Sequence, residues 1–354
     1  MRILVATTMY PNKYRPFSGI FIQKHISILH KNFGIESFLA TGGGSNNSIL
    51  LIIKKYFVLW CQIIWNLTTK NVSLIHAHFS YPTGFFAWIG KFISGKIFII
   101  TIHGSDIHSH KNRNFIAQYL NRIVLHSSDH IIAVSHELKN AITESFCISE
   151  EKISVIDMGV DSTIFFPNNN IPKKEIFTLL FVGRLSEVKG FDVLLDAFEI
   201  LSKNNSSSIK CIVIGDGDQQ SHYKKSVKSR MLTDNVTFMG SQNQTRISEW
   251  MNQSHLVVIP SRKEGFGLVA IEALACGTPV ICSDVGGLKE IVENGKNGFL
   301  FPVEQIDELV ERIERFIKNP ETILSHNCVQ SVKQFDVLEK VKQIYSVYSN
   351  MVSV

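Results

Sequence analysis

The chain has 354 residues, of which 45% are hydrophobic and 19% charged, and its formal net charge is +5. This composition excludes a disordered chain, and the length exceeds one compact core of common size, so two domains are expected. Lys and Arg are spread along the chain without a basic block. They suit an anionic ligand or an anionic membrane surface and identify neither. The six cysteines form no C-x-x-C pair, which predicts free thiols in a reducing, cytoplasmic compartment and no structural metal.

The first half of the chain alternates apolar runs of strand length with segments of helical spacing. The opening MRILVATTMY predicts a buried strand over 3–7, since its apolar run is short for a secretory signal and no small-residue cleavage site follows. Helical spacing marks GIFIQKHISILHKN and ELKNAITESF. Strands that are apolar throughout, separated by helices, predict a parallel sheet buried on both faces. The further strands predicted here cover 73–78, 97–104 and 130–135.

Two segments of this half combine basic, aromatic and apolar residues. SILLIIKKYFVLWCQIIWNL (48–67) is strongly apolar, but Lys54 and Lys55 interrupt it, whereas a membrane span needs about 20 apolar residues without such a pair. A segment of this composition can rest in a lipid headgroup region or fold as a buried helix. We favour peripheral membrane contact for 52–65 and burial for 84–96.

The pattern restarts after the polar, proline-bearing stretch PNNNIPKKE (167–175), which is typical of a linker. The fold class predicted is α/β, with two Rossmann-like doubly wound domains over 1–165 and 166–334, and the amphipathic helix of 335–354 packing back on the first. Ligands of such sheets lie beyond the carboxyl ends of the strands, so two crevices facing each other would form an interdomain cleft. The strands predicted in this half cover 178–184, 210–217, 236–240, 255–260, 279–284 and 298–302.

The stretch EGFGLVAIEA (264–273) combines two glutamates with a glycine-flanked loop and an apolar helix. Gly265 and Gly267 let the backbone approach a ligand, and the start of a helix suits an anion such as a diphosphate. Glu272 lies in an otherwise apolar segment, where a carboxylate needs a partner, and a ribose diol would be one. It is equally possible that Glu264 is an ordinary first-turn acid and that Glu272 faces water. Spacing alone does not decide between the two interpretations.

Two cations follow another strand. In VGRLSEVKG (182–190), Arg184 and Lys189 bracket a turn directly after the predicted strand. A rigid guanidinium and a mobile ammonium on one loop can hold a diphosphate. Such a pair is ordinarily explained as two solvated basic residues. That explanation is weakened here, because both residues follow the carboxyl end of a strand, where ligands bind.

Taken in order and spacing, these motifs resemble the family-4 retaining glycosyltransferases of GT-B fold. GRLSEVKG, VIGDGD, VTFMG and the E-x7-E pair of EGFGLVAIEA carry the resemblance in the second half. In the first half PFSGIFIQKH resembles the family's glycine loop, and KISVIDMGVD its domain-exit strand. TIHGSD resembles the histidine turn of members that build bacterial cell-surface polysaccharides such as lipopolysaccharide and capsule.

The resemblance implies roles for the matching residues. Arg184 and Lys189 would hold the donor diphosphate, Glu264 the donor sugar and Glu272 the ribose. Gly19 would lie beside the diphosphate, and His103 would contact the sugar near its reacting carbon. The acceptor side is less defined: Asp106 and the strand-end histidine His78 are candidates, and His78 could instead make structural hydrogen bonds. The remaining donor-binding positions are Gly215, Phe238, Met239, Gly265, Phe266, Gly267, Leu268 and Val269.

The chemistry implied is transfer of a sugar from a nucleotide-sugar, of which UDP-linked donors are the commoner in the family, to a saccharide or lipid-linked acceptor. IGDGDQ contains Asp216-Gly-Asp218, the spacing of a metal-binding Asp-x-Asp. It occupies a slot where the family binds no metal, so neither a metal nor another cofactor is expected, nor a nucleic-acid partner. A dehydrogenase would need G-x-G-x-x-G in the first turn, which is absent. A sugar epimerase and a nucleotide-sugar-binding protein without catalysis are the competing interpretations.

Overall fold

The computed structural model describes residues 1–13, 15–42, 48–104, 107, 115–204 and 209–353. These residues form two compact units, each built on its own parallel sheet. Unit 1 comprises Met1–Met158 together with the carboxyl-terminal segment from Val337, and unit 2 comprises Gly159–Asp336. The predicted α/β class with two doubly wound sheets is confirmed.

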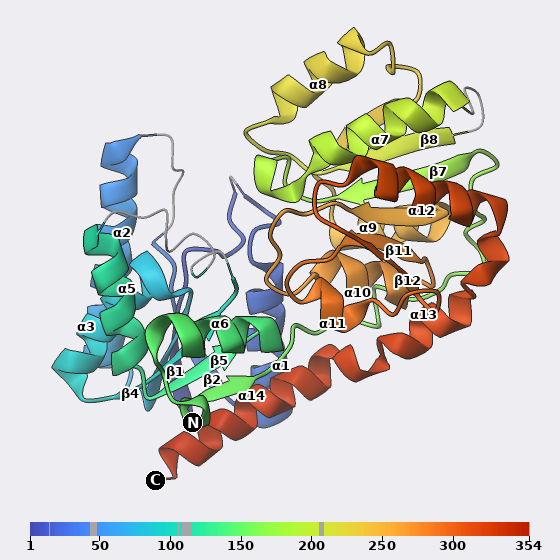
Figure 1. Ribbon diagram of the computed structural model, residues 1–354. Helices are drawn as coiled ribbons and strands as arrows, with labels where there is room; N and C mark the ends of the chain where they lie inside the picture. The colour runs from blue at the N-terminus through green and yellow to red at the C-terminus, as the bar shows by residue number, and fades with distance from the viewer. Residues whose placement is uncertain (14, 43–47, 105–106, 108–114, 205–208, 354) are drawn as a thin grey trace. The chain divides into compact units, whose positions relative to one another are not determined.

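Unit 1 contains a six-stranded sheet in the order β2-β1-β3-β4-β5-β6, paired in parallel throughout (Figure 1). Its strands are β1 (Arg2–Ala6), β2 (Glu36–Ala40), β3 (Leu74–His78), β4 (Ile97–Ile102), β5 (His130–Ala133) and β6 (Ile153–Val155). Its helices are α1 (Ile20–Phe33), α2 (Ile49–Thr69), α3 (Phe85–Ser94), α5 (Phe115–Ser127), α6 (His136–Phe146) and α14 (Val337–Val352), with the short turns η1 (Ser80–Gly84) and η3 (Glu150–Lys152). Strand β2 is absent from the predicted set because it is an edge strand, short and only partly buried.

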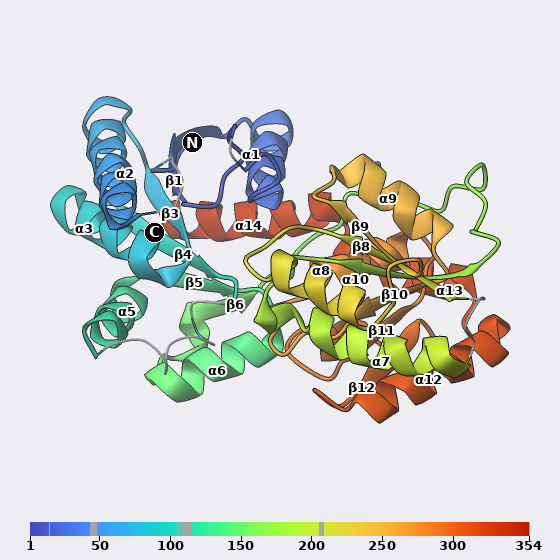
Figure 2. The same cartoon turned by 90° about the horizontal axis from the view of Figure 1, so that it is seen from above.

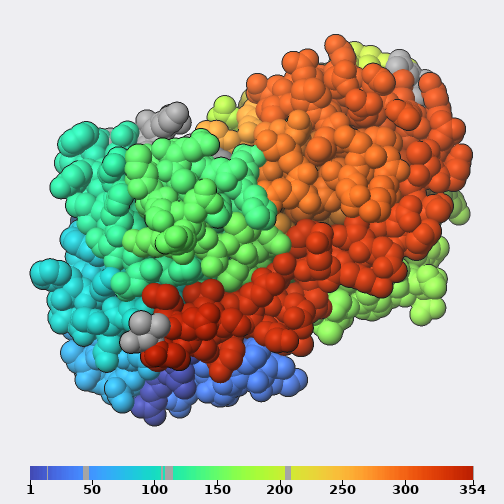
Figure 3. All heavy atoms as spheres, turned by 60° about the horizontal axis from the view of Figure 1, so that its bottom comes forward, coloured from blue at the N-terminus to red at the C-terminus, as the bar shows by residue number. Residues whose placement is uncertain are grey.

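The helices of unit 1 cover both faces of the sheet. Figure 2 shows α2, α3 and α5 on one side and α1 with α14 on the other. On the latter side Ile22 of α1 and Val341 of α14 belong to one buried apolar cluster with Ile3 of β1. The carboxyl-terminal helix thus completes the core of unit 1, and Figure 3 shows it as a red ridge beside the blue amino-terminal atoms.

Helix α2 is, among the described helices, the one long and apolar enough to cross a membrane by length and composition. One side of it is nevertheless used inside unit 1, where Leu59 and Ile63 are fully buried. Glycine Gly90 of α3 packs against this side, so that a Cβ there would lie 2.9 Å from Ile63. The helix therefore serves as one layer of the unit.

Unit 2 repeats the architecture with the order β12-β11-β10-β7-β8-β9, again parallel. Its strands are β7 (Phe177–Val182), β8 (Ile209–Ile214), β9 (Val236–Gly240), β10 (Leu256–Ile259), β11 (Val280–Ser283) and β12 (Gly298–Phe301). Its helices are α7 (Phe191–Asn204), α8 (Gln220–Ser229), α9 (Gln244–Gln253), α10 (Leu268–Ala275), α11 (Leu288–Ile291), α12 (Ile306–Lys318) and α13 (Ser325–Ser331), with the turns η4 (Glu187–Lys189), η5 (Pro320–Thr322) and η6 (Lys333–Phe335).

Candidate functional site

The strand order of unit 2 places a topological switch between β7 and β10. The chain leaves β7 toward β8 on one side, whereas β10 lies on the other side of β7 and leads to β11. Loops that leave two neighbouring parallel strands in opposite directions open a crevice at their carboxyl ends, where ligands of open α/β sheets bind. The loops after β7 and β10 carry Lys189 and Glu264 respectively.

Lys189 and Glu264 meet across these two loops. The Lys189 ammonium lies 2.6 Å from Oε2 of Glu264, and the Ser261 hydroxyl donates to the same oxygen at 3.2 Å. The contact requires close packing of the loops at Gly190, whose φ is 65°. A Cβ at this position would lie 2.0 Å from the Pro260 carbonyl oxygen, so only glycine fits. A larger residue at 190 would push the two loops apart, so the sequence of this turn fixes the distance between the two charges.

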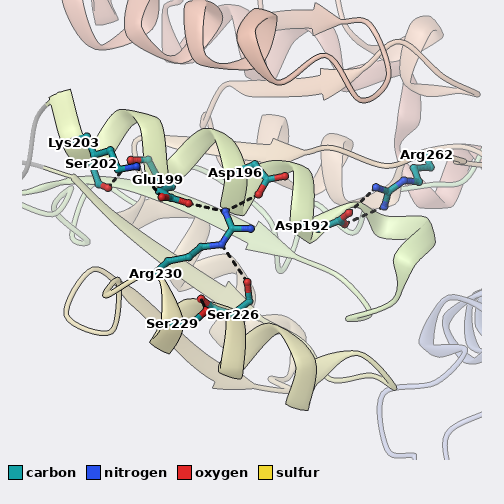
Figure 4. A network of polar contacts seen from close by, with 9 residues as sticks. All are labelled: Asp192, Asp196, Glu199, Ser202, Lys203, Ser226, Ser229, Arg230 and Arg262. Atoms are coloured by element: carbon teal, nitrogen blue, oxygen red, sulfur yellow. Dashed lines mark hydrogen bonds and ion pairs between the residues drawn. The ribbon is translucent and has the colours of Figure 1, made fainter.

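Arg262 joins the same two loops and was not singled out from the sequence. Its guanidinium donates two hydrogen bonds to the Asp192 carboxylate at the start of α7, at 3.0 and 2.6 Å, as Figure 4 shows. It also donates to Glu304 at 2.7 Å and to the Glu187 carbonyl at 2.6 Å. Paired carboxylates raise the pKa of this guanidinium above its ordinary value. A basic residue that pairs with an acid 70 positions away carries no sequence signal; only the folded contact reveals its role.

Arg184 lies at the end of β7 with its side chain in solvent. Its guanidinium reaches Oδ1 of Asp218 at 3.2 Å, and both side chains are more than half exposed. The Asp216 carboxylate instead accepts from the backbone N–H of Gly217. The two aspartates of the Asp-x-Asp spacing thus have separate partners, and no cluster of three His, Cys, Asp or Glu side chains suited to a metal occurs in the part of the chain that is described.

The start of α10 supplies backbone donors beside Glu264. Gly267 caps this helix at φ 115°, and a Cβ on it would lie 2.6 Å from Leu288. In the first turn, the N–H groups of Leu268 and Val269 have no acceptor within the helix. Phe266 is 3% exposed and packs edge-on against Phe335 at 5.5 Å between ring centroids. Its side chain anchors the loop, which leaves its backbone for a ligand.

Glu272 lies one turn further along α10 and is partly buried. Burial raises the pKa of its carboxyl from 4.5 to about 8. Across the described residues, this carboxyl has no hydrogen-bond or ion-pair partner. A carboxyl held in a poorly hydrated place without a partner is costly, and a pair of ligand hydroxyls would satisfy it.

The positions predicted to meet the base lie on the edge strand β9. Phe238 pairs with Val213 of β8, and the next pairing joins Gly240 to Ile214, so Met239 is left out of the ladder by a bulge. The Met239 carbonyl accepts from the Gln242 side chain at 2.8 Å. Gly215, at the end of β8, is hydrogen-bonded to the Gly240 carbonyl. The outer side of an edge strand leaves backbone groups for a ligand.

In unit 1 the predicted residues lie at the carboxyl edge of the sheet, where Gly19 precedes α1 and His103 follows β4. Nδ1 of His78 lies 3.0 Å from Nε2 of His103. His78 is 4% exposed, so it contacts His103 rather than the surface. Asp106 lies outside the described residues.

Another buried histidine, His76, makes two side-chain contacts that hold the structure together. Its two ring nitrogens lie 2.5 Å from the Tyr348 hydroxyl of α14 and 2.7 Å from the Thr101 hydroxyl.

Burial, together with the charges of His25 and His76, lowers the pKa of His103 to about 3. At neutral pH the ring of His103 is therefore uncharged, so it can donate one hydrogen bond and accept one. It does not act as a cationic general acid.

The family models match both halves of the chain. The model described as "Glycosyl transferases group 1" matches residues 161–335, and the model described as "Glycosyltransferase Family 4" matches residues 42–163. An uncharacterized glycosyltransferase of Methanocaldococcus jannaschii is 31% identical over 290 residues, 80% of this chain and 77% of the relative. The N-acetyl-alpha-D-glucosaminyl L-malate synthase of Bacillus anthracis is 27% identical over 262 residues, 71% of this chain and 67% of the relative.

Two solved structures share the fold over almost the whole chain. Sucrose-phosphate synthase from Thermosynechococcus elongatus has a TM-score of 0.87 at 20% identity, with 99% of each chain covered. The Anabaena protein HepE, solved in complex with UDP-glucose, has a TM-score of 0.81 at 21% identity, with 99% of this chain and 100% of HepE covered. At these identities the likeness establishes the fold.

Proposed function

Because this chain belongs to glycosyltransferase family 4 and is a transferase enzyme, we propose that it is a retaining, metal-independent hexosyltransferase with a nucleotide-sugar donor. The observation that carries this proposal is the contact of Lys189 with Glu264 at the switch point of unit 2. It joins a cation for a diphosphate to a carboxylate for sugar hydroxyls within one hydrogen-bond length. The start of α10 adds backbone donors on the same loop.

The donor would occupy this crevice through five kinds of contact. The ammonium of Lys189 retains two N–H donors beyond the one directed at Glu264, and these would meet the diphosphate, assisted by Arg184. Glu264 would accept from hydroxyls of the sugar, and the backbone of Gly265 to Val269 would meet the phosphates. Glu272 would bind the ribose diol, and the bulge at Met239 with Phe238 would meet the base.

The reaction proposed is the front-face transfer that the family resemblance implies. The bond between the anomeric carbon and the diphosphate oxygen breaks, its electron pair leaves with the diphosphate, and an oxocarbenium-like centre develops. Lys189, Arg184 and the first turn of α10 would stabilise the negative charge on the leaving group. The acceptor hydroxyl would attack from the same face, and its proton would pass to a leaving phosphate oxygen. Two cations beside the diphosphate would make a metal unnecessary for this charge.

The neutral histidine of unit 1 suits the sugar in this scheme. His103 would hydrogen-bond the donor sugar near the reacting carbon of the sugar. Nε2 of His103 contacts Nδ1 of His78, which positions the ring. Because its pKa is lowered to about 3, the ring would add no positive charge next to the oxocarbenium-like centre. Gly19 would lie beside the diphosphate.

The donor base and the acceptor are proposed on different grounds. HepE, of the same fold, binds UDP-glucose, which supports a UDP-linked donor. For the acceptor, the chain resembles members that build cell-surface polysaccharide, and a lipopolysaccharide outer core galactosyltransferase has the same fold with a TM-score of 0.72. We propose a saccharide or lipid-linked saccharide acceptor at the inner face of the plasma membrane, with peripheral contact through the α2 region.

A thermal-shift panel tests the proposal. Purified protein is heated with UDP, GDP, ADP or CMP, each with and without EDTA. A ligand at 100 times its dissociation constant stabilises a fold by about 2.7 kcal/mol, so selective stabilisation by UDP that EDTA leaves unchanged is expected. Stabilisation abolished by EDTA would contradict the metal-independent scheme and reassign Asp216 and Asp218. No shift with any nucleotide would contradict the donor site itself.

A further inference from the structure

Unit 1 contains a polar cavity of about 40 Å³ at the carboxyl edge of its sheet. Its walls come from the loop between β1 and α1, from the residue that follows β2, and from helix α2; Figure 2 shows the two helices on opposite sides of β1. The lining includes the hydroxyl side chains of Thr8, Ser18 and Thr41. It also includes two cations, Arg15 and Lys55, and none of the described residues that line the cavity is acidic.

The fold separates the two neighbouring lysines of α2. Lys54 is exposed, whereas Lys55 is 8% exposed. Lys55 packs closely against Gly42, where a Cβ would lie 2.6 Å from the Lys55 carbonyl oxygen and 3.1 Å from its Cγ. Burial lowers the pKa of the Lys55 ammonium, and the charge of Arg15 lowers it further. Both effects disfavour the charged form, so an anionic ligand in the cavity would stabilise it.

A second lysine of unit 1 is buried to the same depth and shows the usual arrangement. Lys340 of α14 is 7% exposed, and its ammonium lies 2.9 Å from the Asp157 carboxylate. In the cavity beside Lys55, the other charged group of the described lining is the cation Arg15. Two like charges in one cavity repel each other. An anion between them would replace this repulsion by two attractions.

A tight turn fixes the backbone of Arg15 at the cavity. Asn12 and Arg15 exchange two backbone hydrogen bonds, with N–O distances of 3.3 and 3.1 Å. The Arg15 N–H also lies 3.1 Å from Oδ1 of Asn12, and the Ser18 N–H donates to the Arg15 carbonyl at 3.2 Å. The side chain of Arg15 is exposed, so it can adjust to a ligand. A guanidinium suits an oxyanion in particular, because it can donate two parallel hydrogen bonds to it.

Neutral donors and the size of the cavity narrow the ligand further. The hydroxyl hydrogens of Thr8, Ser18 and Thr41 can rotate toward an acceptor. A volume of about 40 Å³ holds a few water-sized groups. It therefore suits a phosphate or carboxylate group and is too small for a whole sugar ring, which would remain outside.

The cavity lies at the edge of the sheet that carries the proposed sugar contact. Thr41 follows β2 and His103 follows β4, so both lie beyond the carboxyl ends of parallel strands. One strand, β3, separates β1 from β4, which puts the ends of these two strands about 10 Å apart. A short saccharide can bridge this distance. Ser18 of the lining also directly precedes Gly19.

We propose that this polar cavity binds an oxyanion of the acceptor saccharide, a phosphate or carboxylate group held between Arg15 and Lys55. The inference rests on the proposed function, which supplies the acceptor, and it narrows that acceptor to an acidic saccharide. The cavity would hold the charged end of the acceptor, and the neutral edge around His103 would receive the hydroxyl that attacks.

Calorimetric titration of the full chain tests this subsite. The titrants are glucose, glucose 6-phosphate and glucuronate, each with and without saturating UDP, which fills the proposed donor crevice. With UDP present, at least one of the two acidic sugars should bind about tenfold more tightly than glucose. Comparison of these two affinities distinguishes a phosphate from a carboxylate ligand.

Three variants assign the binding to the cavity. Lys55→Met keeps a long buried side chain and removes the charge, and it should weaken binding of the acidic sugar about tenfold. Arg15→Gln should weaken it about threefold, because solvent and salt screen an exposed guanidinium. Lys54→Gln removes the same charge from the exposed neighbour and should leave the affinity unchanged.

Three results would overturn the proposal. They are no preference for either acidic sugar over glucose, unchanged affinity in both Lys55→Met and Arg15→Gln, and binding of the acidic sugar that saturating UDP abolishes. The last would assign the anion to the donor site. UDP thermal shifts keep the two hypotheses apart. A retained shift shows that a variant is folded, whereas acidic-sugar binding that Lys55→Met removes, in a chain without any UDP shift, would contradict the proposed function alone.

Discussion

The carboxyl edges of the two sheets share a topology and differ in charge. In unit 2 the edge carries ionised side chains in pairs, Lys189 with Glu264 and Arg184 with Asp218. In unit 1 the corresponding edge carries His76, His78 and His103, whose pKa values burial lowers far enough to leave them neutral. The same topology therefore carries two different chemistries, paired charges in unit 2 and neutral rings in unit 1. Under the proposed function, the paired charges of unit 2 would hold a diphosphate.

Removing the cation of unit 2 is expected to have the largest effect. Lys189→Ala should lower the rate of glycosyl transfer about 100- to 1,000-fold, the usual cost of losing one electrostatic donor to a developing anion. The control is Lys203→Ala, an exposed lysine of α7 that pairs with Glu199 and should change nothing. Steady-state kinetics with UDP-sugars measure the difference, and equal rates in both variants would remove Lys189 from the mechanism.

We expect Arg262 to act by positioning the loops after β7 and β10 rather than by contacting the donor. Arg262→Lys keeps the charge and loses the two-pronged bond to Asp192. We expect transfer to fall about tenfold and Tm by about 5 °C. Arg230→Lys is the matched control, because Arg230 bridges Asp196 and Glu199 of the same helix (Figure 4).

The two arginine variants separate stability from function. Both should melt earlier, while only Arg262→Lys should raise the KM for the donor. A matching loss of activity in Arg230→Lys would show that general destabilisation, and not the join between the two loops, explains the first result.

Glu272 should make nucleotide binding depend on pH. In the free protein its carboxyl has a pKa of about 8, and ribose hydroxyls that donate to it would favour the ionised form. UDP affinity should therefore rise between pH 6 and pH 8, by up to about tenfold per pH unit. Calorimetric titration of wild type and Glu272→Gln measures this. The variant should lose the dependence, whereas Glu293→Gln, at an exposed acid paired with Lys296, should retain it.

The raised pKa of the Glu272 carboxyl also predicts how the free energy of unfolding changes with pH. Its folded-state pKa lies above the ordinary 4.5, so the folded chain binds the extra proton between these values. The contribution to the free energy of unfolding is fully present below pH 4.5 and is lost as the pH rises to about 8, by at most about 1.4 kcal/mol per pH unit. Melting of Glu272→Gln should decline less over this range, and parallel curves would contradict the assignment.

The smallest effect is expected from the histidines of unit 1. Because the pKa of His103 is lowered to about 3, the pH profile of kcat should show no ionisation from this ring between pH 5 and 8. His103→Gln should lower kcat and leave the shape of the profile unchanged. A step near pH 6 in wild type that this variant removes would mean that the ring is charged during turnover.

Much of unit 2 could be predicted because its signals are local. Continuous apolar runs such as that of β10 mark strands buried on both faces, and the glycines Gly265 and Gly267 mark a loop whose backbone can approach a ligand. The two glutamates of α10 and its preceding loop are separated by a fixed number of residues, so their spacing is visible without a fold. Edge strand β2 was missed because exposure on one side removes the continuous apolar pattern.

The sequence by itself determined the α/β class and the family, because apolar periodicity and short motifs depend on neighbours along the chain. Only the tertiary structure decided that Lys189 reaches Glu264, that Arg262 ties their loops to α7, and that His78 contacts His103. It also decided which side of α2 is buried and that the starts of α2 and α5 share one end of the sheet. Charge pairing and burial depend on residues far apart in sequence, which come together only when parallel strands align their ends.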